Sequence, residues 1–218
     1  DGGARSVVGI RDVQIPDALR FFSDEPREVR VHAEREGDAV RCRLTGDFRN
    51  RRGQLVQKDR PHFSAVVELG AEAAIEAARP ATRGAWFDMR YPPRDALLYH
   101  GPPLRLLERM AVDGSEGWGE IRLPGRNELA GNRDPRGWLT PSAAIDACCY
   151  ACGVYTWVFA DRGVTVPDRL AELRFGRPGR PSERCVVHLV CRGLEARSGR
   201  FDFTLFGVVL VKILRGAD

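Results

Sequence analysis

"TPSAAIDACCYACGVY", residues 140–155, is the stretch that decides the predicted fold. It is small, apolar and almost free of charge, and Pro141 suits the first turn of a helix. The pattern predicts one long helix over 142–161, and because it is apolar nearly all round we expect burial on most of its sides. One acid, Asp146, lies in its first turns. Such an acid is either a partner of the helix N-terminus or a proton donor.

The first third of the chain has the composition of β-strands. Its strand-like segments are residues 6–15, 27–36, 39–48 and 62–69. Two of them alternate apolar and polar residues, and the pair Gly37 and Asp38 between these two is typical of a hairpin turn. We therefore expect an antiparallel meander of four strands within residues 1–70.

Residues 71–93 are rich in Ala and Glu around a proline and are interpreted as a linker. The second half, 94–218, opens with a predicted short helix that stops at Gly101, Pro102 and Pro103, and a strand follows over 117–124. After the long helix come further strand-like segments, with Gly207 predicted to mark a hairpin turn. They are residues 170–176, 184–195, 199–207 and 208–214.

This order of segments predicts an α+β fold. A single long helix wrapped by an antiparallel sheet is the hotdog arrangement, and two sets of strands joined by a linker indicate a double hotdog. Residues 94–218 supply a second hotdog with its central helix over 142–161. Residues 1–70 supply strands only, so the first hotdog is expected to lack its N-terminal part, including its own helix.

Composition and charge narrow the class of function. Hydrophobic residues make up 43% and charged residues 29% of 218, as is ordinary for a globular protein. The net charge of +4 comes with no basic helix and no interleaved aromatic and basic residues, which argues against nucleic acid as a partner. No apolar run is long enough for a membrane span, and no leader is recognisable, so we expect a cytoplasmic protein.

The six cysteines are predicted to be reduced and structural. Cys149 and Cys152 form a C-x-x-C pair, but no second such pair or pair of histidines follows at zinc spacing. Small thiols pack well in an apolar helix. The sequence therefore predicts no metal site.

Four segments, in order, resemble the dehydratase domains of type I polyketide and polyunsaturated fatty acid synthases, which are double hotdogs. They are "SVVGIRDVQI" (6–15), "LLYHGPPLRLLERM" (97–110), "TPSAAIDACCY" (140–150) and "GRFDFTLFGVVLVKIL" (199–214). The resemblance covers nearly the whole chain, and the Cys- and Ala-rich helix leans toward iterative enediyne-type synthases. It implies a multifunctional synthase of the kind used in antibiotic biosynthesis.

The sequence departs from the family's pattern at several positions. Leu104 replaces a Phe, Arg105 a Gln, and Tyr150 the Gln of the helix. The motif H-x-x-x-G-x-x-x-x-P, which carries the family's catalytic histidine, fits none of the four histidines. In the family this motif precedes the strand matched by 6–15, so we expect the catalytic histidine to lie outside these residues, upstream of Asp1.

The resemblance implies the elimination of water from a 3-hydroxyacyl thioester. A base removes the C2 proton and an acid protonates the departing oxygen at C3. The histidine is assigned to the first task and Asp146 to the second, and an apolar surrounding would disfavour the charged carboxylate. Tyr150, four residues on, is expected to orient the carboxyl group. Tyr99, Gly101 and Pro102 are expected to line the substrate channel or set a turn beside it.

The implied partners are an acyl carrier protein that presents the 3-hydroxyacyl chain on phosphopantetheine, other synthase domains, and a second copy of the chain in a homodimer. No cofactor of the domain's own is implied, and no membrane. Two alternatives stay open. One is a non-catalytic hotdog module that binds acyl chains or holds the synthase together, and the other is a hotdog thioesterase. Chain length and stereochemistry of the substrate are not encoded in any recognisable motif.

Overall fold

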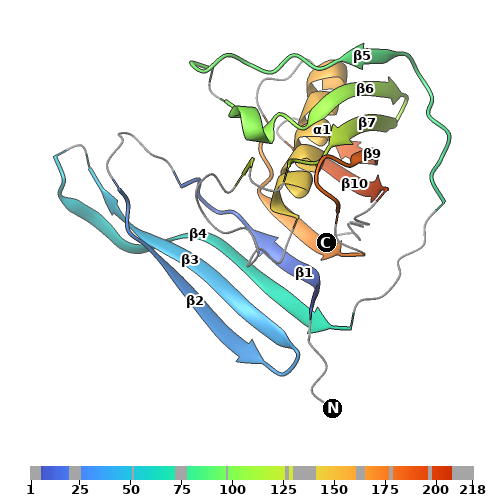
Figure 1. The fold of residues 1–218 in the computed structure, drawn as a ribbon. Helices are drawn as coiled ribbons and strands as arrows, with labels where there is room; N and C mark the ends of the chain where they lie inside the picture. Colours follow the sequence, from blue (N-terminus) through green and yellow to red (C-terminus); the bar gives the residue numbers. More distant parts are fainter. Residues whose placement is uncertain are drawn as a thin grey trace. The chain divides into compact units, whose positions relative to one another are not determined.

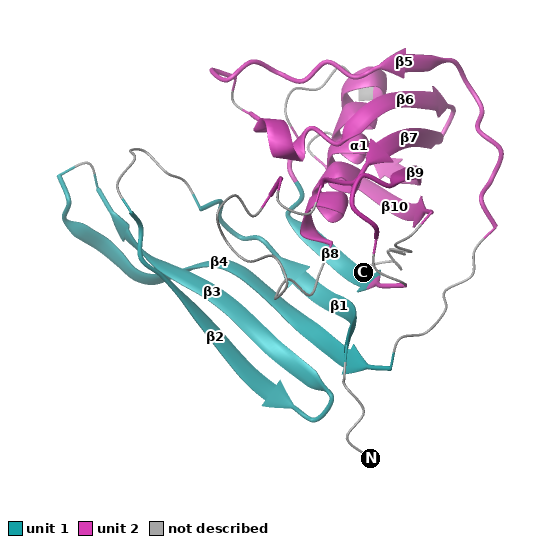
Figure 2. Ribbon diagram, viewed as in Figure 1, with its two compact units in different colours: residues 1–71, 167–173, 215–218 teal, residues 72–166, 174–214 magenta. Residues whose placement is uncertain are grey.

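The computed structural model describes residues 6–19, 26–50, 52–71, 78–96, 98–125, 128–129, 141–160, 165–176, 179–195 and 198–207. These residues form two compact units, shown in different colours in Figure 2. Unit 1 contains the described residues of 1–71 and 167–173, and unit 2 those of 72–166 and 174–214. In the part of the chain so described, no helix combines the length and apolarity that crossing a membrane requires.

Unit 1 is built on a five-stranded sheet in the order β2-β3-β4-β1-β8. Its strands are β1 (Ser6–Gln14), β2 (Val29–Glu36), β3 (Ala39–Arg49), β4 (Leu55–Gly70) and β8 (Arg169–Arg174). The predicted hairpin between β2 and β3 is confirmed, since Glu36 pairs with Ala39 and Gly37 adopts the positive φ of 62° that such a turn requires. β4 lies inside the sheet and pairs with β3 on one side and β1 on the other.

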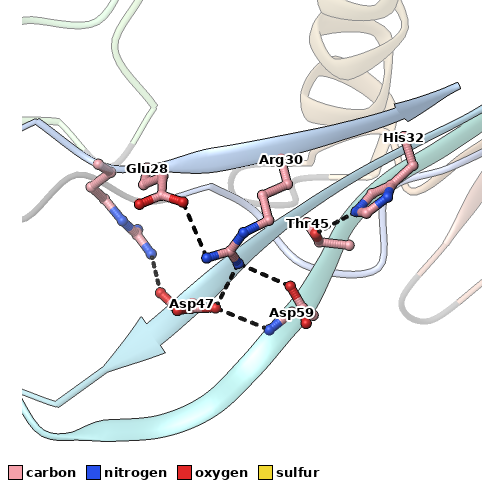
Figure 3. Close-up of polar contacts among 7 residues, drawn as sticks. Glu28, Arg30, His32, Thr45, Asp47 and Asp59 are labelled. Carbon is pink, nitrogen blue, oxygen red and sulfur yellow. Dashed lines mark hydrogen bonds and ion pairs between the residues drawn. The ribbon is translucent and has the colours of Figure 1, made fainter.

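Ion pairs connect the three strands β2, β3 and β4 on the surface of unit 1 (Figure 3). The guanidinium of Arg30 contacts Glu28 at 3.1 Å, Asp47 at 3.0 Å and Asp59 at 2.9 Å. The hydrogen bond from Arg30 holds the pKa of Asp47 below its ordinary value. Nearby, the ring of His32 lies 3.3 Å from the hydroxyl of Thr45. The network links residues far apart in sequence, and its exposure to solvent limits its energetic weight.

Unit 2 consists of a second five-stranded sheet, in the order β10-β9-β7-β6-β5, and one long helix (Figure 1). The strands are β5 (Trp86–Asp88), β6 (Leu107–Asp113), β7 (Glu116–Arg122), β9 (Arg184–Leu194) and β10 (Gly199–Phe206), and all four pairings are antiparallel. The helix, α1 (Ser142–Ala160), lies against β6, β7, β9 and β10. A helix covering an antiparallel sheet in this way is the hotdog arrangement that the sequence predicts.

The buried residues of α1 recur at helical spacing along one face. They are Ala143, Ala144, Ala147, Cys148, Ala151, Val154, Tyr155 and Thr156. The other residues from Ala143 to Thr156 are half-buried, and the exposed side chains are those of Ser142 and of residues 157–159, where Trp157 is 62% exposed. The expectation of burial on most sides is therefore confirmed over 143–156 and wrong for the C-terminal turn.

Two close contacts fix the helix and the sheet of unit 2. The hydroxyl of Tyr155 donates a hydrogen bond of 2.7 Å to the carbonyl of Gly114, in the turn between β6 and β7. In the centre of the sheet, a Cβ on Gly119 would lie 2.6 Å from the side chain of Leu107 and 2.9 Å from that of Val187. Only a glycine leaves room for both apolar side chains there.

Four predictions differ from the structure. The strands of unit 1 do not form a simple meander, because β1 pairs with β4 rather than with its neighbour β2. β8 joins the sheet of unit 1, although it lies within 94–218. The predicted linker 71–93 contains β5, which pairs with β6. The short helix expected near residue 94 is absent from the described residues there, where a turn precedes β6. The predicted strand 208–214 lies outside the described residues.

Candidate functional site

The site in unit 2 is centred on Asp146, in the second turn of α1. Its side chain is 43% exposed, yet its Oδ2 atom is buried and has no hydrogen-bond partner among the described residues. The exposed part of the side chain therefore belongs to the other carboxyl oxygen, Oδ1, and the methylene group. The carboxyl group has one oxygen turned into the protein and the other accessible to a ligand.

The buried oxygen faces a histidine. The Nε2 atom of His100 lies 3.4 Å from Oδ2 of Asp146, and the His100 side chain is only 8% exposed. The second ring nitrogen of His100, Nδ1, is buried and also lacks a hydrogen-bond partner among the described residues. Two residues that are far apart in sequence thus place a ring nitrogen and a buried carboxyl oxygen 3.4 Å apart.

A short turn after His100 holds it in place. Gly101 precedes the 3-10 turn η1 (Pro102–Leu104), and its carbonyl accepts a hydrogen bond of 2.9 Å from Leu104. The chain then reverses, so that the guanidinium of Arg105 donates a 3.0 Å hydrogen bond to the carbonyl of His100. The proline-rich sequence of η1 restricts the backbone, which favours this geometry.

Two tyrosine rings surround the His100 side chain. Tyr150, one helical turn after Asp146, stacks on Tyr91 with ring centroids 5.0 Å apart and an angle of 10° between the planes. The ring of His100 is tilted against Tyr150 at 4.5 Å and against Tyr91 at 5.8 Å. The Tyr91 hydroxyl donates to the carbonyl of Leu107 at 3.2 Å and accepts from its N–H at 2.9 Å. The pair of rings is therefore tied to the start of β6.

Burial keeps the acidic side chains around Asp146 protonated. It raises the pKa of Tyr91 well above its ordinary value, although the hydrogen bond to Leu107 opposes this, and it raises the pKa of Tyr150 as well. Burial raises the pKa of Cys149 to about 12. Near neutral pH these three groups are neutral, and they supply a weakly polar surrounding to the carboxyl group.

The structure brings some of the predicted site residues together and not others. Tyr150 lies beside Asp146, but no hydrogen bond joins its hydroxyl to the carboxyl group; its ring packs on Tyr91 instead. Gly101 and Pro102 form the turn that precedes Arg105. Tyr99 is 39% exposed and lies under the guanidinium of Arg105, 5.6 Å from the ring centroid. Its predicted place in the substrate channel stays a prediction.

Sequence reasoning missed the roles of His100 and Tyr91. His100 is one of the four histidines that do not fit the family's catalytic motif, and nothing in the sequence brings it near Asp146. The signal available was its position directly before Gly101 in the segment that resembles the family. Tyr91 falls in the predicted linker, where no local pattern marks it.

The other histidines have partners of their own. His62 is buried in unit 1, with Nδ1 3.1 Å from the carbonyl of Asp17. His188 in unit 2 lies 2.8 Å from the carboxylate of Glu116. Among the described residues no group of His, Cys, Asp and Glu is arranged to hold a metal ion. All six cysteines are free.

No protein-family model matches the chain, and the search of curated proteins finds no match. Solved structures do match. The dehydratase domain from the CurJ module of the curacin polyketide synthase has a TM-score of 0.63 and 14% identity, and the match covers 94% of this chain and 72% of that one. A trans-AT polyketide synthase dehydratase domain from Brevibacillus brevis has a TM-score of 0.65 and 17% identity, and the match covers 95% of this chain and 74% of that one. A trans-acyltransferase polyketide synthase enoyl-isomerase has a TM-score of 0.58 and 12% identity, and the match covers 95% of this chain and 79% of that one.

These matches establish the class of fold. The chain has the hotdog-like fold of polyketide synthase dehydratase domains, with two sheets and one long helix in its described residues, so the resemblance read from the sequence is confirmed at the level of the fold. An enoyl-isomerase has the same fold, and a fold does not determine the reaction it supports.

Proposed function

We propose that the chain dehydrates 3-hydroxyacyl thioesters to 2-enoyl thioesters during polyketide or fatty-acid assembly. The observation that carries this proposal is the Asp146 carboxyl group, which has one buried and one accessible oxygen on a hotdog-type central helix. A double hotdog that uses both units is part of the proposal, as is an acyl carrier protein that presents the substrate on its phosphopantetheine arm. The domain needs no resident cofactor for this reaction.

The chemistry requires an acid on the leaving oxygen. The C2 proton is removed, the electrons of that C–H bond form the C2–C3 double bond, and the C3–O bond breaks. Asp146 gives its proton to the departing hydroxyl, which leaves as water, and the Asp146 carboxylate is then reprotonated. Because hydroxide is a poor leaving group, the proton donor has most of its effect as the C–O bond breaks. We assign the base at C2 to a histidine outside the 218 residues, since none of the four here fits the family's motif.

The thioester carbonyl gathers negative charge when the C2 proton leaves. Backbone N–H groups at a helix N-terminus stabilise such charge, and α1 begins one turn before Asp146. The carbonyl is therefore proposed to lie near the first turn of α1, with the 3-hydroxyl group toward Oδ1.

Incubation of the full-length protein with 3-hydroxyacyl pantetheine thioesters, followed by mass spectrometry and thiol titration, tests the proposal. A dehydratase yields a product that has lost one water while the thioester stays intact. A hotdog thioesterase releases free thiol and the intact hydroxy acid, and an enoyl-isomerase moves a double bond in a 2-enoyl substrate without change of mass. Binding without turnover of any of these substrates would instead indicate a non-catalytic hotdog module.

A further inference from the structure

The contact between His100 and Asp146 has unusual features for a packing contact. Nε2 and Oδ2 lie 3.4 Å apart, Oδ2 has no hydrogen-bond partner in the described residues, and Nδ1 of the same ring has none either. Burying polar atoms without partners is costly, whereas an apolar side chain could fill the space beside Tyr91 and Tyr150. The presence of a histidine at position 100 is therefore explained by the contact of its Nε2 atom with Asp146 and not by the space that its ring fills.

The surroundings of the ring select one protonation state. A neutral imidazole has one N–H donor and one acceptor nitrogen, and an imidazolium has two donors. Because Nδ1 is buried without an acceptor, an N–H there would be left unpaired. A proton on Nε2 instead lies on the nitrogen that is 3.4 Å from a carboxyl oxygen, which can accept it after a small movement of the ring. The neutral ring with its proton on Nε2 fits this site best.

We propose that His100 is the positioning residue of Asp146: its Nε2–H donates to Oδ2, so that the proton to be delivered resides on Oδ1. This inference rests on the proposed function. A neutral carboxyl group carries its proton on one oxygen only. Because Oδ2 accepts the hydrogen bond from Nε2–H, the proton of the carboxyl group is placed on Oδ1, the oxygen that reaches the surface. In this structure the 3.4 Å contact does not have hydrogen-bond geometry, and hydrogen bonds between catalytic groups often form fully only when substrate is bound.

His100 also has a part after the proton has left. The resulting carboxylate keeps its hydrogen bond from Nε2–H, and a bond to a charged acceptor is stronger than one to a neutral acceptor. The histidine thus stabilises the product state of Asp146 without exchanging a proton with it. The neighbouring side chains do not replace this donor, because Arg105 donates to the backbone carbonyl of His100 and the rings of Tyr91 and Tyr150 pack face to face.

Two amide substitutions of equal polarity separate positioning from packing. The amide nitrogen of Gln can occupy the place of Nε2, and the shorter Asn places its nitrogen near Nδ1. In the full-length protein, we expect His100→Gln to keep kcat within about threefold and His100→Asn to lower it roughly 10- to 100-fold, as loss of one hydrogen bond to a charged group would. His100→Leu fills the same space with an apolar side chain that has no hydrogen-bond donor, and its kcat is expected to fall as far as that of His100→Asn. Equal rates in all three variants would overturn the proposal.

A second measurement does not depend on activity. Two-dimensional ¹⁵N NMR of the histidine side chains reports which ring nitrogen carries the proton. We expect a neutral His100 with the proton on Nε2, and a shift of the Nε2 resonance in Asp146→Asn. A proton on Nδ1, or an imidazolium, would refute the positioning role even in an active enzyme. If the wild type dehydrates no 3-hydroxyacyl thioester, the proposed function fails, and the NMR result still decides the state of the pair.

Discussion

Removing a single hydroxyl group tests how the aromatic pair beside Asp146 is held. In Tyr91→Phe the ring remains stacked on Tyr150, but the N–H and C=O of Leu107 lose the hydroxyl that both contact, at 2.9 and 3.2 Å. Leu107 is 1% exposed, so water does not readily replace that hydroxyl. A buried group left unpaired costs about 1–3 kcal/mol, and we expect a loss of about 2 kcal/mol in the free energy of unfolding. For a chain of this size that is a fall in Tm of roughly 4–8 °C.

Tryptophan fluorescence is the appropriate assay, because all four tryptophans fall within 72–166 and report on unit 2. Tyr99→Phe is the matched control. It removes the same hydroxyl group from a side chain that is 39% exposed, and we expect its Tm to stay within about 1 °C of the wild type. Equal Tm values for the two variants would show that the bridge to Leu107 does not stabilise unit 2, and the reasoning about the ring pair would be refuted.

Three further predictions concern unit 2. Because the pKa of Cys149 is raised to about 12, its thiol should stay protonated at mildly alkaline pH. Iodoacetamide should therefore label Cys149 much more slowly in the folded protein than in the unfolded chain, and equal labelling rates by mass spectrometry would contradict this. Arg109 donates hydrogen bonds of 2.8 and 2.7 Å to the carboxylate of Glu120, and these lower the pKa of Glu120 from its ordinary value of 4.5. The ion pair therefore stabilises the fold fully above pH 4.5, and this stabilisation is lost as the pH falls through the lowered pKa. The difference in Tm between wild type and Arg109→Gln should therefore shrink in acid, and a constant difference would rule out the linkage. Gly119→Ala should lower the free energy of unfolding, measured with urea, by about 1–3 kcal/mol. An unchanged urea midpoint would show that the side chains of Leu107 and Val187 move aside at no cost in stability.

The sequence predicts the long helix and most strands because these depend on local patterns. The helix predicted over 142–161 is observed as Ser142–Ala160, and the β2–β3 hairpin follows from its turn residues. The short helix predicted before Gly101 is absent from the described residues there, where the chain forms turns and bends.

Pairing between distant strands is the part that local patterns do not contain. β1 and β4 are separated by the whole β2–β3 hairpin, and β8 reaches the first sheet from beyond the helix. The same limit applies to the site. Asp146 is recognisable because it interrupts an apolar helix and matches a family motif. In the sequence, His100 and Asp146 are separated by η1, by the strands β6 and β7, and by the connection to α1. The two residues come into contact only in the folded unit.

The most direct test of the account is the rate of dehydration by Asp146→Asn in the full-length protein, measured by single turnover with a 3-hydroxyacyl pantetheine thioester. The amide keeps the shape of the side chain and has no acidic proton to give. We expect turnover to fall by about 10²- to 10⁴-fold, as for loss of a general acid, with substrate binding nearly unchanged. Turnover equal to that of the wild type would show that the proton reaches the leaving oxygen from elsewhere, and the role assigned to Asp146 would be wrong.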